Sequence, residues 1–273
     1  MIFDKSKCQL GEGPLWHPER AELFWFDILG KHLHCADRHW QFPGYVSAAG
    51  WVDHDTLLIA SDIALSRFDI PSSDSTHICA LEADNPVTRS NDGRADPQGG
   101  FWIGTMGINA EDGAGAIYRF YKGELRQLFA PITISNAICF APDGTTAYFT
   151  DTPTQQIMRV RLDKDGWPNT DPEVFIDLQG TDFRPDGAVV DTDGNLWSAQ
   201  WGAGRVAGYA PGGTFIAAFP FPAAQTTCPA FGGPDMTTLH CTSAAVGLDG
   251  DEDGKTFATP TKYTGQKEHR VIL

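Results

Sequence analysis

Short runs of aromatic and aliphatic residues recur along the chain, and each run follows a polar turn. The clearest copies are Leu23-Phe24-Trp25-Phe26 after Glu19-Arg20, Phe101-Trp102-Ile103 after Gln98-Gly99, Ala147-Tyr148-Phe149 after Asp143-Gly144, and Leu196-Trp197 after Asp193-Gly194. These runs have the length and composition of β-strands. The Asp-Gly pairs favour hairpin turns, because glycine readily adopts positive φ. No segment shows a sustained helical period, so the pattern predicts an all-β fold.

The hairpins form a repeat. Two weaker copies, at His54-Asp55 and Pro234-Asp235, bring the number to six, and successive copies lie about 35 to 50 residues apart. Each interval is long enough for a four-stranded sheet, and such sheets arranged radially make a propeller. A β-sandwich is the alternative, but it does not account for the regular spacing. The sequence therefore predicts one six-bladed β-propeller domain over residues 1–273.

A polar residue precedes each clear hairpin by seven positions. These residues are Glu12, Asn91, Asn136 and Asp186; the weaker copies offer Ser47 and Thr226 or Thr227 near the same offset. The position begins the strand that lines the central channel of a propeller. We therefore expect the side chains to converge on the axis at one end of the molecule.

Carboxylates and carboxamides supply oxygen ligands, and two carboxylates brought close together repel unless a cation lies between them. The donor set suits Ca²⁺, Mg²⁺ or Mn²⁺ and also accommodates Zn²⁺. The pattern thus predicts one divalent metal ion on the central axis. The alternative is that these residues only shape turns, where Asn, Asp and Gly are common.

Charge and composition narrow the partners. The formal net charge is −15, which disfavours nucleic acid and anionic membranes as partners. The N-terminus lacks the basic and apolar regions of a signal peptide, and the six cysteines form no Cys-x-x-Cys pair. We therefore expect a cytoplasmic protein, a monomer, with free buried thiols.

Seven motifs in order along the chain resemble the regucalcin/gluconolactonase family, also called the senescence-marker-protein and luciferin-regenerating-enzyme family. They are Gly11-Glu12-Gly13-Pro14-Leu15-Trp16, Arg89-Ser90-Asn91-Asp92-Gly93-Arg94, Gly104-Thr105-Met106, Ile134-Ser135-Asn136-Ala137, Tyr148-Phe149-Thr150-Asp151-Thr152, Pro185-Asp186-Gly187 and Phe231-Gly232-Gly233-Pro234-Asp235.

The resemblance implies a six-bladed propeller that hydrolyses sugar lactones, with the metal held by Glu12, Asn136 and Asp186. It also implies substrate contacts by Arg89 and Asn91, and by an acidic residue on loop 107–115 that corresponds to Glu111. Hydrolysis needs a polarised carbonyl and an activated water, so we expect Asp186 to accept a proton as well as hold the metal.

Two other functions stay open at this point. A propeller with the same metal site could hydrolyse organophosphates, as diisopropylfluorophosphatase-like proteins do. A propeller can also serve as a non-enzymatic metal-binding or interaction platform, because fold alone does not fix function. The set of acidic and amide residues favours the enzyme, since a scaffold has no need of it.

Overall fold

The computed structural model describes residues 1–36 and 38–273, and its regular secondary structure is almost entirely β-strand. Blades 1 to 3 contain β2 (Gly11–His17), β3 (Glu22–Asp27), β4 (His32–Cys35), β5 (Arg38–Gln41), β6 (Val46–Asp53), β7 (Thr56–Ser61), β8 (Ala64–Asp69), β9 (Ser75–Ala80), β10 (Thr88–Ala95), β11 (Phe101–Gly107), β12 (Gly115–Tyr121) and β13 (Glu124–Ile132). Blades 4 to 6 contain β14 (Ser135–Phe140), β15 (Thr146–Asp151), β16 (Gln156–Arg161), β17 (Glu173–Asp177), β18 (Arg184–Val190), β19 (Leu196–Trp201), β20 (Arg205–Tyr209), β21 (Phe215–Pro220), β22 (Gln225–Gly232), β23 (Thr238–Ala244), β24 (Thr256–Pro260) and β1 (Ile2–Asp4). A short 3-10 helix, η1 (Thr152–Thr154), follows β15.

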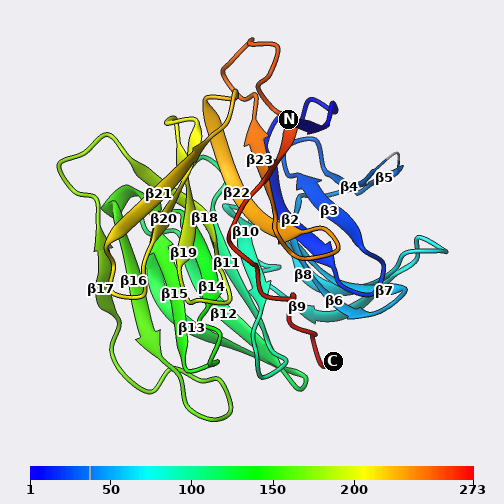
Figure 1. Cartoon of the computed structure of the whole chain (residues 1–273). Helices are drawn as coiled ribbons and strands as arrows, with labels where there is room; N and C mark the ends of the chain where they lie inside the picture. The colour runs from blue at the N-terminus through cyan, green and yellow to red at the C-terminus, as the bar shows by residue number, and fades with distance from the viewer. Residues whose placement is uncertain (37) are drawn as a thin grey trace.

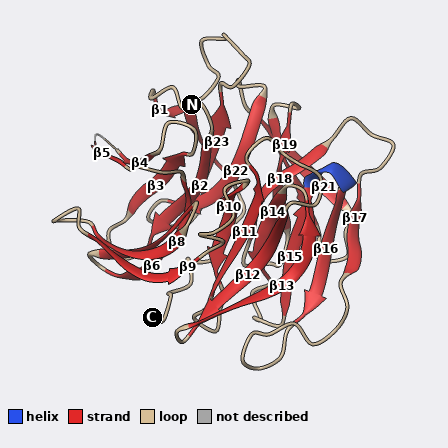
Figure 2. Ribbon diagram, turned by 180° about the vertical axis from the view of Figure 1, so that it is seen from behind, coloured by secondary structure: helices blue, strands red, loops and turns tan. Residues whose placement is uncertain are grey.

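The strands form six four-stranded antiparallel sheets, and this confirms the predicted six-bladed propeller. The inner strands β2, β6, β10, β14, β18 and β22 each contact the inner strands of the two neighbouring blades, so the ring is closed. Figure 1 shows the first blade beside the last, and Figure 2 shows the same arrangement from behind. The N-terminal strand β1 pairs with β24 and supplies the outer strand of blade 6. The repeat in the sequence does not predict this pairing, because β1 lies outside the repeat.

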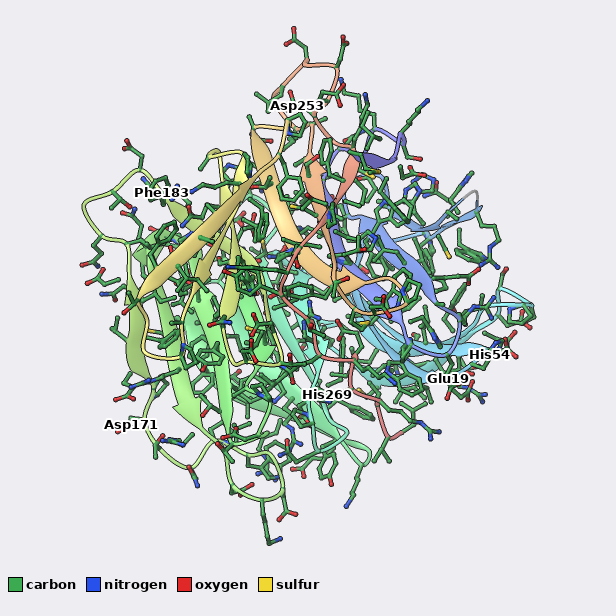
Figure 3. All side chains as sticks on the ribbon, in the orientation of Figure 1. Glu19, His54, Asp171, Phe183, Asp253 and His269 are labelled. Atoms are coloured by element: carbon green, nitrogen blue, oxygen red, sulfur yellow. The ribbon has the colours of Figure 1, made fainter. Side chains whose placement is uncertain are left out.

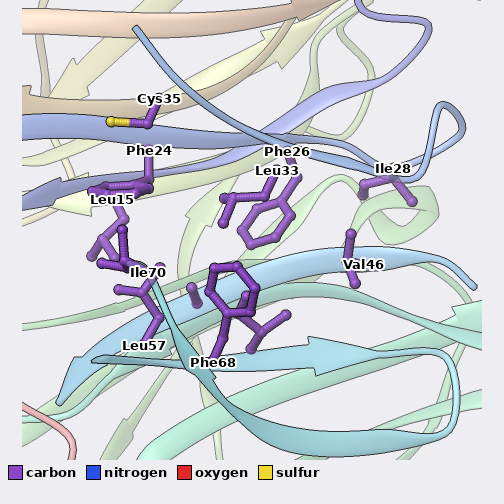
Figure 4. Packing of buried hydrophobic residues seen from close by; sticks show 12 residues of the cluster. Leu15, Phe24, Phe26, Ile28, Leu33, Cys35, Val46, Leu57, Phe68 and Ile70 are labelled. Carbon is purple, nitrogen blue, oxygen red and sulfur yellow. The ribbon is translucent and has the colours of Figure 1, made fainter. Parts of the chain in front are cut away.

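Hydrophobic layers between successive blades make up the core. Between blades 1 and 2, for example, Phe24, Phe26 and Leu33 pack against Leu57 and Phe68 (Figure 4). Trp25, Trp102 and Trp197 each lie in the second strand of a blade and are fully buried. The aromatic runs seen in the sequence are therefore the contacts that hold neighbouring blades together.

Every inner strand contains a register shift relative to its hairpin partner. In β2 and β14 the shift comes directly after the predicted polar residue, Glu12 or Asn136. In β10 and β18 the shifted segment contains the predicted polar residue, Asn91 or Asp186. Bulges of this kind turn a side chain away from the regular alternation of the strand. Gly13 and Ala137, which follow Glu12 and Asn136, have φ values of 54° and 57°. A Cβ atom on Gly13 would collide with the Ser47 carbonyl oxygen, so glycine is required there.

The segment after β24 crosses one end of the propeller (red in Figure 1). Gln266 donates hydrogen bonds to the carbonyl oxygens of Phe140 and Val190, at 3.0 and 2.9 Å. Glu268 forms an ion pair with Arg94, and the Val271 amide donates to the Trp51 carbonyl. This segment therefore joins blades 2, 3, 4 and 5 at the end of the channel remote from the predicted metal ligands.

All six cysteines are free, and five of them are buried, which confirms the sequence-based expectation of free thiols. Among residues 1–36 and 38–273, no helix is long and apolar enough to span a bilayer.

Candidate functional site

A cavity of about 420 Å³ lies where the inner strands begin. Five of the six blades contribute to its lining: Leu10, Glu12, Arg89, Asn91, Met106, Ile134, Asn136, Thr152, Pro153, Arg184, Asp186, Trp201 and Val246. Its volume lies in the range of small-molecule sites. Figure 3 shows Phe183 and Asp253, from loops at this end of the propeller, well away from Glu19 and His54 in hairpins at the other end.

Glu12 and Asp186 place two carboxylates in the floor of this cavity, and both side chains are buried. Burial raises the pKa of Asp186 well above its ordinary value, and the neighbouring Glu12 and Asp92 carboxylates raise it further. Burial and the Asp92 carboxylate likewise raise the pKa of Glu12, while Arg89 opposes the shift. The floor thus concentrates negative charge that a bound cation would stabilise.

Asp92 is a third buried carboxylate, directly behind the floor. It accepts a hydrogen bond of 2.7 Å from the Ile138 amide and so connects blade 3 to blade 4. Burial raises the pKa of Asp92 to about 6. The sequence does not mark Asp92 as a site residue, because its burial depends on the packing of two blades.

The two carboxamides contact each other. Asn91 Nδ2 donates to the Ser135 carbonyl at 2.9 Å and to Asn136 Oδ1 at 3.2 Å. Asn136 Nδ2 donates to Thr152 Oγ1 at 3.0 Å, and the Thr152 hydroxyl donates to the Pro185 carbonyl at 2.8 Å. This chain of hydrogen bonds orients the amide oxygens and ends beside Asp186, so blades 3, 4 and 5 are fixed relative to one another.

Arg89 is a buried cation in the wall of the cavity. Its Nη1 donates to the Ser90 carbonyl at 2.8 Å and to Asn91 Oδ1 at 2.7 Å, whereas its buried Nε has no partner within the described residues. Burial lowers the pKa of Arg89 to about 10, so the guanidinium remains charged at neutral pH. It therefore retains donors for a ligand oxygen.

Aspartates at the ends of β3 and β15 anchor the loops that lead into β2 and β14. Asp27 accepts hydrogen bonds from the Gln9 and Leu10 amides, both at 3.0 Å. Asp151 accepts hydrogen bonds from the Thr133 and Ile134 amides, at 3.0 and 2.8 Å. Each pair of bonds fixes the backbone just before a residue of the cavity floor, Glu12 or Asn136.

We expect Asp151→Ala to lower stability by about 1–3 kcal/mol, because two backbone donors lose their acceptor. The floor should also bind a divalent cation more weakly, since Asn136 loses its support. Thermal unfolding and calorimetric titration with Ca²⁺ measure the two effects. Asp143→Ala removes a comparable turn bond, to Thr145, in the same blade and should leave cation affinity unchanged. Equal affinity losses in both variants would contradict a positioning role for Asp151.

The structure places most predicted site residues together. Arg89, Asn91, Asn136, Asp186 and Glu12 all line the cavity. Glu111 is not among the lining residues, and its carboxylate accepts hydrogen bonds from the amide and side chain of Asn109, at 3.1 and 3.0 Å. Its contact with a substrate stays a prediction.

The ring of polar residues does not extend around all six blades. Ser47 donates to Ser90 Oγ at 2.8 Å, and Thr227 donates to the Gly11 carbonyl at 2.5 Å, so these short hydroxyl side chains join neighbouring blades instead of lining the cavity. Conversely, Thr152, Arg184, Trp201 and Val246 belong to the cavity. The seven-residue offset selected none of these four residues, because they lie in loops or at the ends of strands.

The donors in the floor fit a divalent cation. Two buried carboxylates and two carboxamides provide hard oxygen ligands from four blades. No group of three or more His, Cys, Asp or Glu side chains in residues 1–36 and 38–273 is arranged to hold a metal ion. A metal here would therefore depend on the carboxamide oxygens as well as on Glu12 and Asp186.

Residues 10–245 match the family model described as the SMP-30/Gluconolactonase/LRE-like region, and the chain belongs to this family. A structure of regucalcin from Agrobacterium tumefaciens, described as a calcium-binding protein, is 43% identical, with a TM-score of 0.97 over 100% of this chain and 97% of that chain. L-arabinolactonase from Azospirillum brasilense is 35% identical over 98% of this chain and 94% of its own. The 6-deoxy-6-sulfogluconolactonase of Pseudomonas putida is 32% identical over 95% of this chain and 94% of its own. These findings confirm the resemblance inferred from the motifs.

Proposed function

We propose that this chain is a metal-dependent sugar lactonase that hydrolyses a cyclic sugar ester to the open-chain sugar acid. One observation carries the proposal: the floor of an open cavity gathers two buried carboxylates and two carboxamides from four blades. Relatives named as lactonases, one of them 35% identical over nearly the whole chain, support the reaction class.

Glu12, Asn136 and Asp186 are the proposed metal ligands, with Asn91 beside them. The regucalcin relative described as calcium-binding supports a divalent ion. When bound, such an ion polarises the lactone carbonyl and makes a nearby water more acidic.

In the proposed reaction, Asp186 accepts a proton from a water as that water attacks the lactone carbonyl carbon. A carboxylate that lines a substrate cavity can serve as a general base. The bond between the carbonyl carbon and the ring oxygen then breaks, and the ring oxygen takes up a proton as the hydroxyl of the product. Asp186, which holds the transferred proton, is well placed to return it.

Arg89 is proposed to bind the lactone oxygens and the negative charge that develops during the attack. Its guanidinium is held by Ser90 and Asn91, so little reorganisation is required when the substrate binds. Asn91 contacts both Arg89, the proposed substrate-binding group, and Asn136, a proposed metal ligand. These two contacts hold Arg89 and Asn136 in a fixed position relative to each other.

Removal of the metal should abolish the catalysed reaction. We expect protein stripped with a chelator and dialysed to hydrolyse glucono- and galactono-lactones at the uncatalysed rate. Addition of Ca²⁺, Mn²⁺, Mg²⁺ or Zn²⁺ should restore activity and raise the melting temperature, because the cation stabilises the paired carboxylates. At 100 times its Kd, a ligand adds about 2.7 kcal/mol to stability. Acid release followed with a pH indicator measures the rate. Full activity in protein shown by elemental analysis to be metal-free would overturn metal dependence.

A further inference from the structure

Arg184 is a cation in the cavity lining that the proposed chemistry does not use. It begins β18, two residues before Asp186, and its side chain is exposed. Its Nη1 lies a long 3.5 Å from the Thr181 carbonyl oxygen, and no ion pair involves Arg184 within residues 1–36 and 38–273. Its donors are therefore free to bind a ligand.

The backbone that carries Arg184 is held firmly. Gln155 Nε2 donates to the carbonyl oxygens of Thr181 and Phe183, both at 2.9 Å. The Arg205 guanidinium lies 3.8 Å from the centre of the Phe183 ring. Trp201, the cross-strand partner of Arg184, also lines the cavity. The guanidinium thus projects from a fixed position beside an aromatic wall that suits the C–H face of a sugar.

The charges of the cavity do not suit a neutral ligand alone. Its ionisable lining comprises two carboxylates, Glu12 and Asp186, and two guanidiniums, Arg89 and Arg184. With the divalent cation of the proposed function bound, the lining carries an excess of two positive charges, which the Asp92 carboxylate behind the floor reduces to one, although the whole chain has a formal net charge of −15. A local excess of this sign in an acidic protein favours anionic ligands.

We propose that the lactone carries a second acidic group at the end of the sugar remote from the ring carbonyl, and that Arg184 binds this group. The inference rests on the proposed function and specifies its substrate class. Arg184 and Asp186 are two residues apart at the start of β18, so their Cα atoms lie about 7 Å apart. In a six-carbon 1,4-lactone C5 and C6 extend from the ring, so a carboxylate at C6 can meet the long Arg184 side chain while the ring carbonyl lies near Asp186.

Two lactones that differ only at C6 test this inference. D-glucaro-1,4-lactone has a carboxylate at C6, where D-glucono-1,4-lactone has a hydroxymethyl group. We expect metal-loaded protein to favour the glucaro-lactone in kcat/KM. Arg184→Gln should reduce the ratio of the two kcat/KM values by about 10- to 100-fold, as expected for loss of a charged hydrogen bond. Arg184→Lys should retain part of the preference, and added salt should weaken it. Arg159→Gln, which breaks an exposed pair with Glu173, is the matched control and should leave the ratio unchanged.

An unchanged ratio in Arg184→Gln would overturn the inference while leaving the lactonase proposal intact. If neither lactone is hydrolysed, the proposed function fails, and calorimetric binding of the open-chain products decides the role of Arg184 separately. Tighter binding of glucarate than of gluconate, lost in Arg184→Gln, would support the anion site. Equal binding of both acids would overturn it.

Discussion

Asp186→Asn is expected to reduce the lactonase kcat by about 10³-fold, since loss of a general base or of one stabilising group costs 10²- to 10⁴-fold. The substitution keeps the shape of the side chain but removes a carboxylate from the cavity floor. It therefore affects both proposed roles of Asp186, as metal ligand and as proton acceptor. Initial rates with a sugar lactone at saturating divalent cation measure the effect.

The stability of the same variant separates a chemical defect from unfolding. Asp186 has a raised pKa in the folded protein, so the free energy of unfolding of metal-free protein falls as pH rises above its ordinary value of about 3.9. At pH 8 metal-free Asp186→Asn should therefore unfold at the same temperature as the wild type or higher. Exposed Asp182→Asn is the control and should keep full activity. A marked fall in melting temperature at pH 8 without metal would contradict the view that the two floor carboxylates repel each other.

Asp96→Ala is expected to lower stability by about 3–5 kcal/mol, because it leaves a buried guanidinium without its counter-charge. Asp96 Oδ2 lies 2.6 Å from Arg119 Nε, and both side chains are fully buried. Asp96 also accepts hydrogen bonds from the Gln98 and Gly100 amides, both at 2.9 Å, in the turn after β10. The melting temperature should fall by about 6–20 °C, at 2–4 °C per kcal/mol for a chain of this size.

The exposed pair in the same blade provides the comparison. Arg126 and Glu124 lie 2.9 Å apart with more than half of each side chain exposed, so Glu124→Ala should cost less than about 1 kcal/mol. The double variant Asp96→Ala/Arg119→Leu should recover part of the loss, because the unpaired charge is gone. If the double variant is no more stable than Asp96→Ala, the loss comes from the turn and not from the buried charge.

The sequence predicted the propeller because its evidence is local and repeated. Each hairpin signal needs only a few neighbouring residues, and the six copies support one another. The same repeat placed Glu12, Asn91, Asn136 and Asp186 in one ring, since symmetry brings equivalent positions to the axis. For Ser47, and for Thr226 or Thr227, the offset predicted a similar location, but their short hydroxyl groups form hydrogen bonds to adjacent blades instead.

The remaining features depend on contacts that have no period. Arg184 and Val246 reach the cavity from a strand end and a loop whose course is set by neighbours such as Gln155. The Asp96–Arg119 pair joins residues 23 positions apart. The sequence alone does not indicate that either side chain is buried. The roles of Asp27 and Asp151 become clear only when both are seen to hold the loop before the inner strand.

The pairing of β1 with β24 has a consequence for biosynthesis. The ammonium group of Met1 donates a hydrogen bond to the carbonyl oxygen of Ala258, which lies 257 residues away in the chain. Ribosomes add roughly 5–20 residues per second, so Met1 is made about 13 to 50 s before Ala258. During that time β1, with Ile2 and Phe3 exposed even in the finished protein, has no sheet to join. Blade 6 therefore gains its outermost strand only after synthesis has passed β24, long after β1 itself was made.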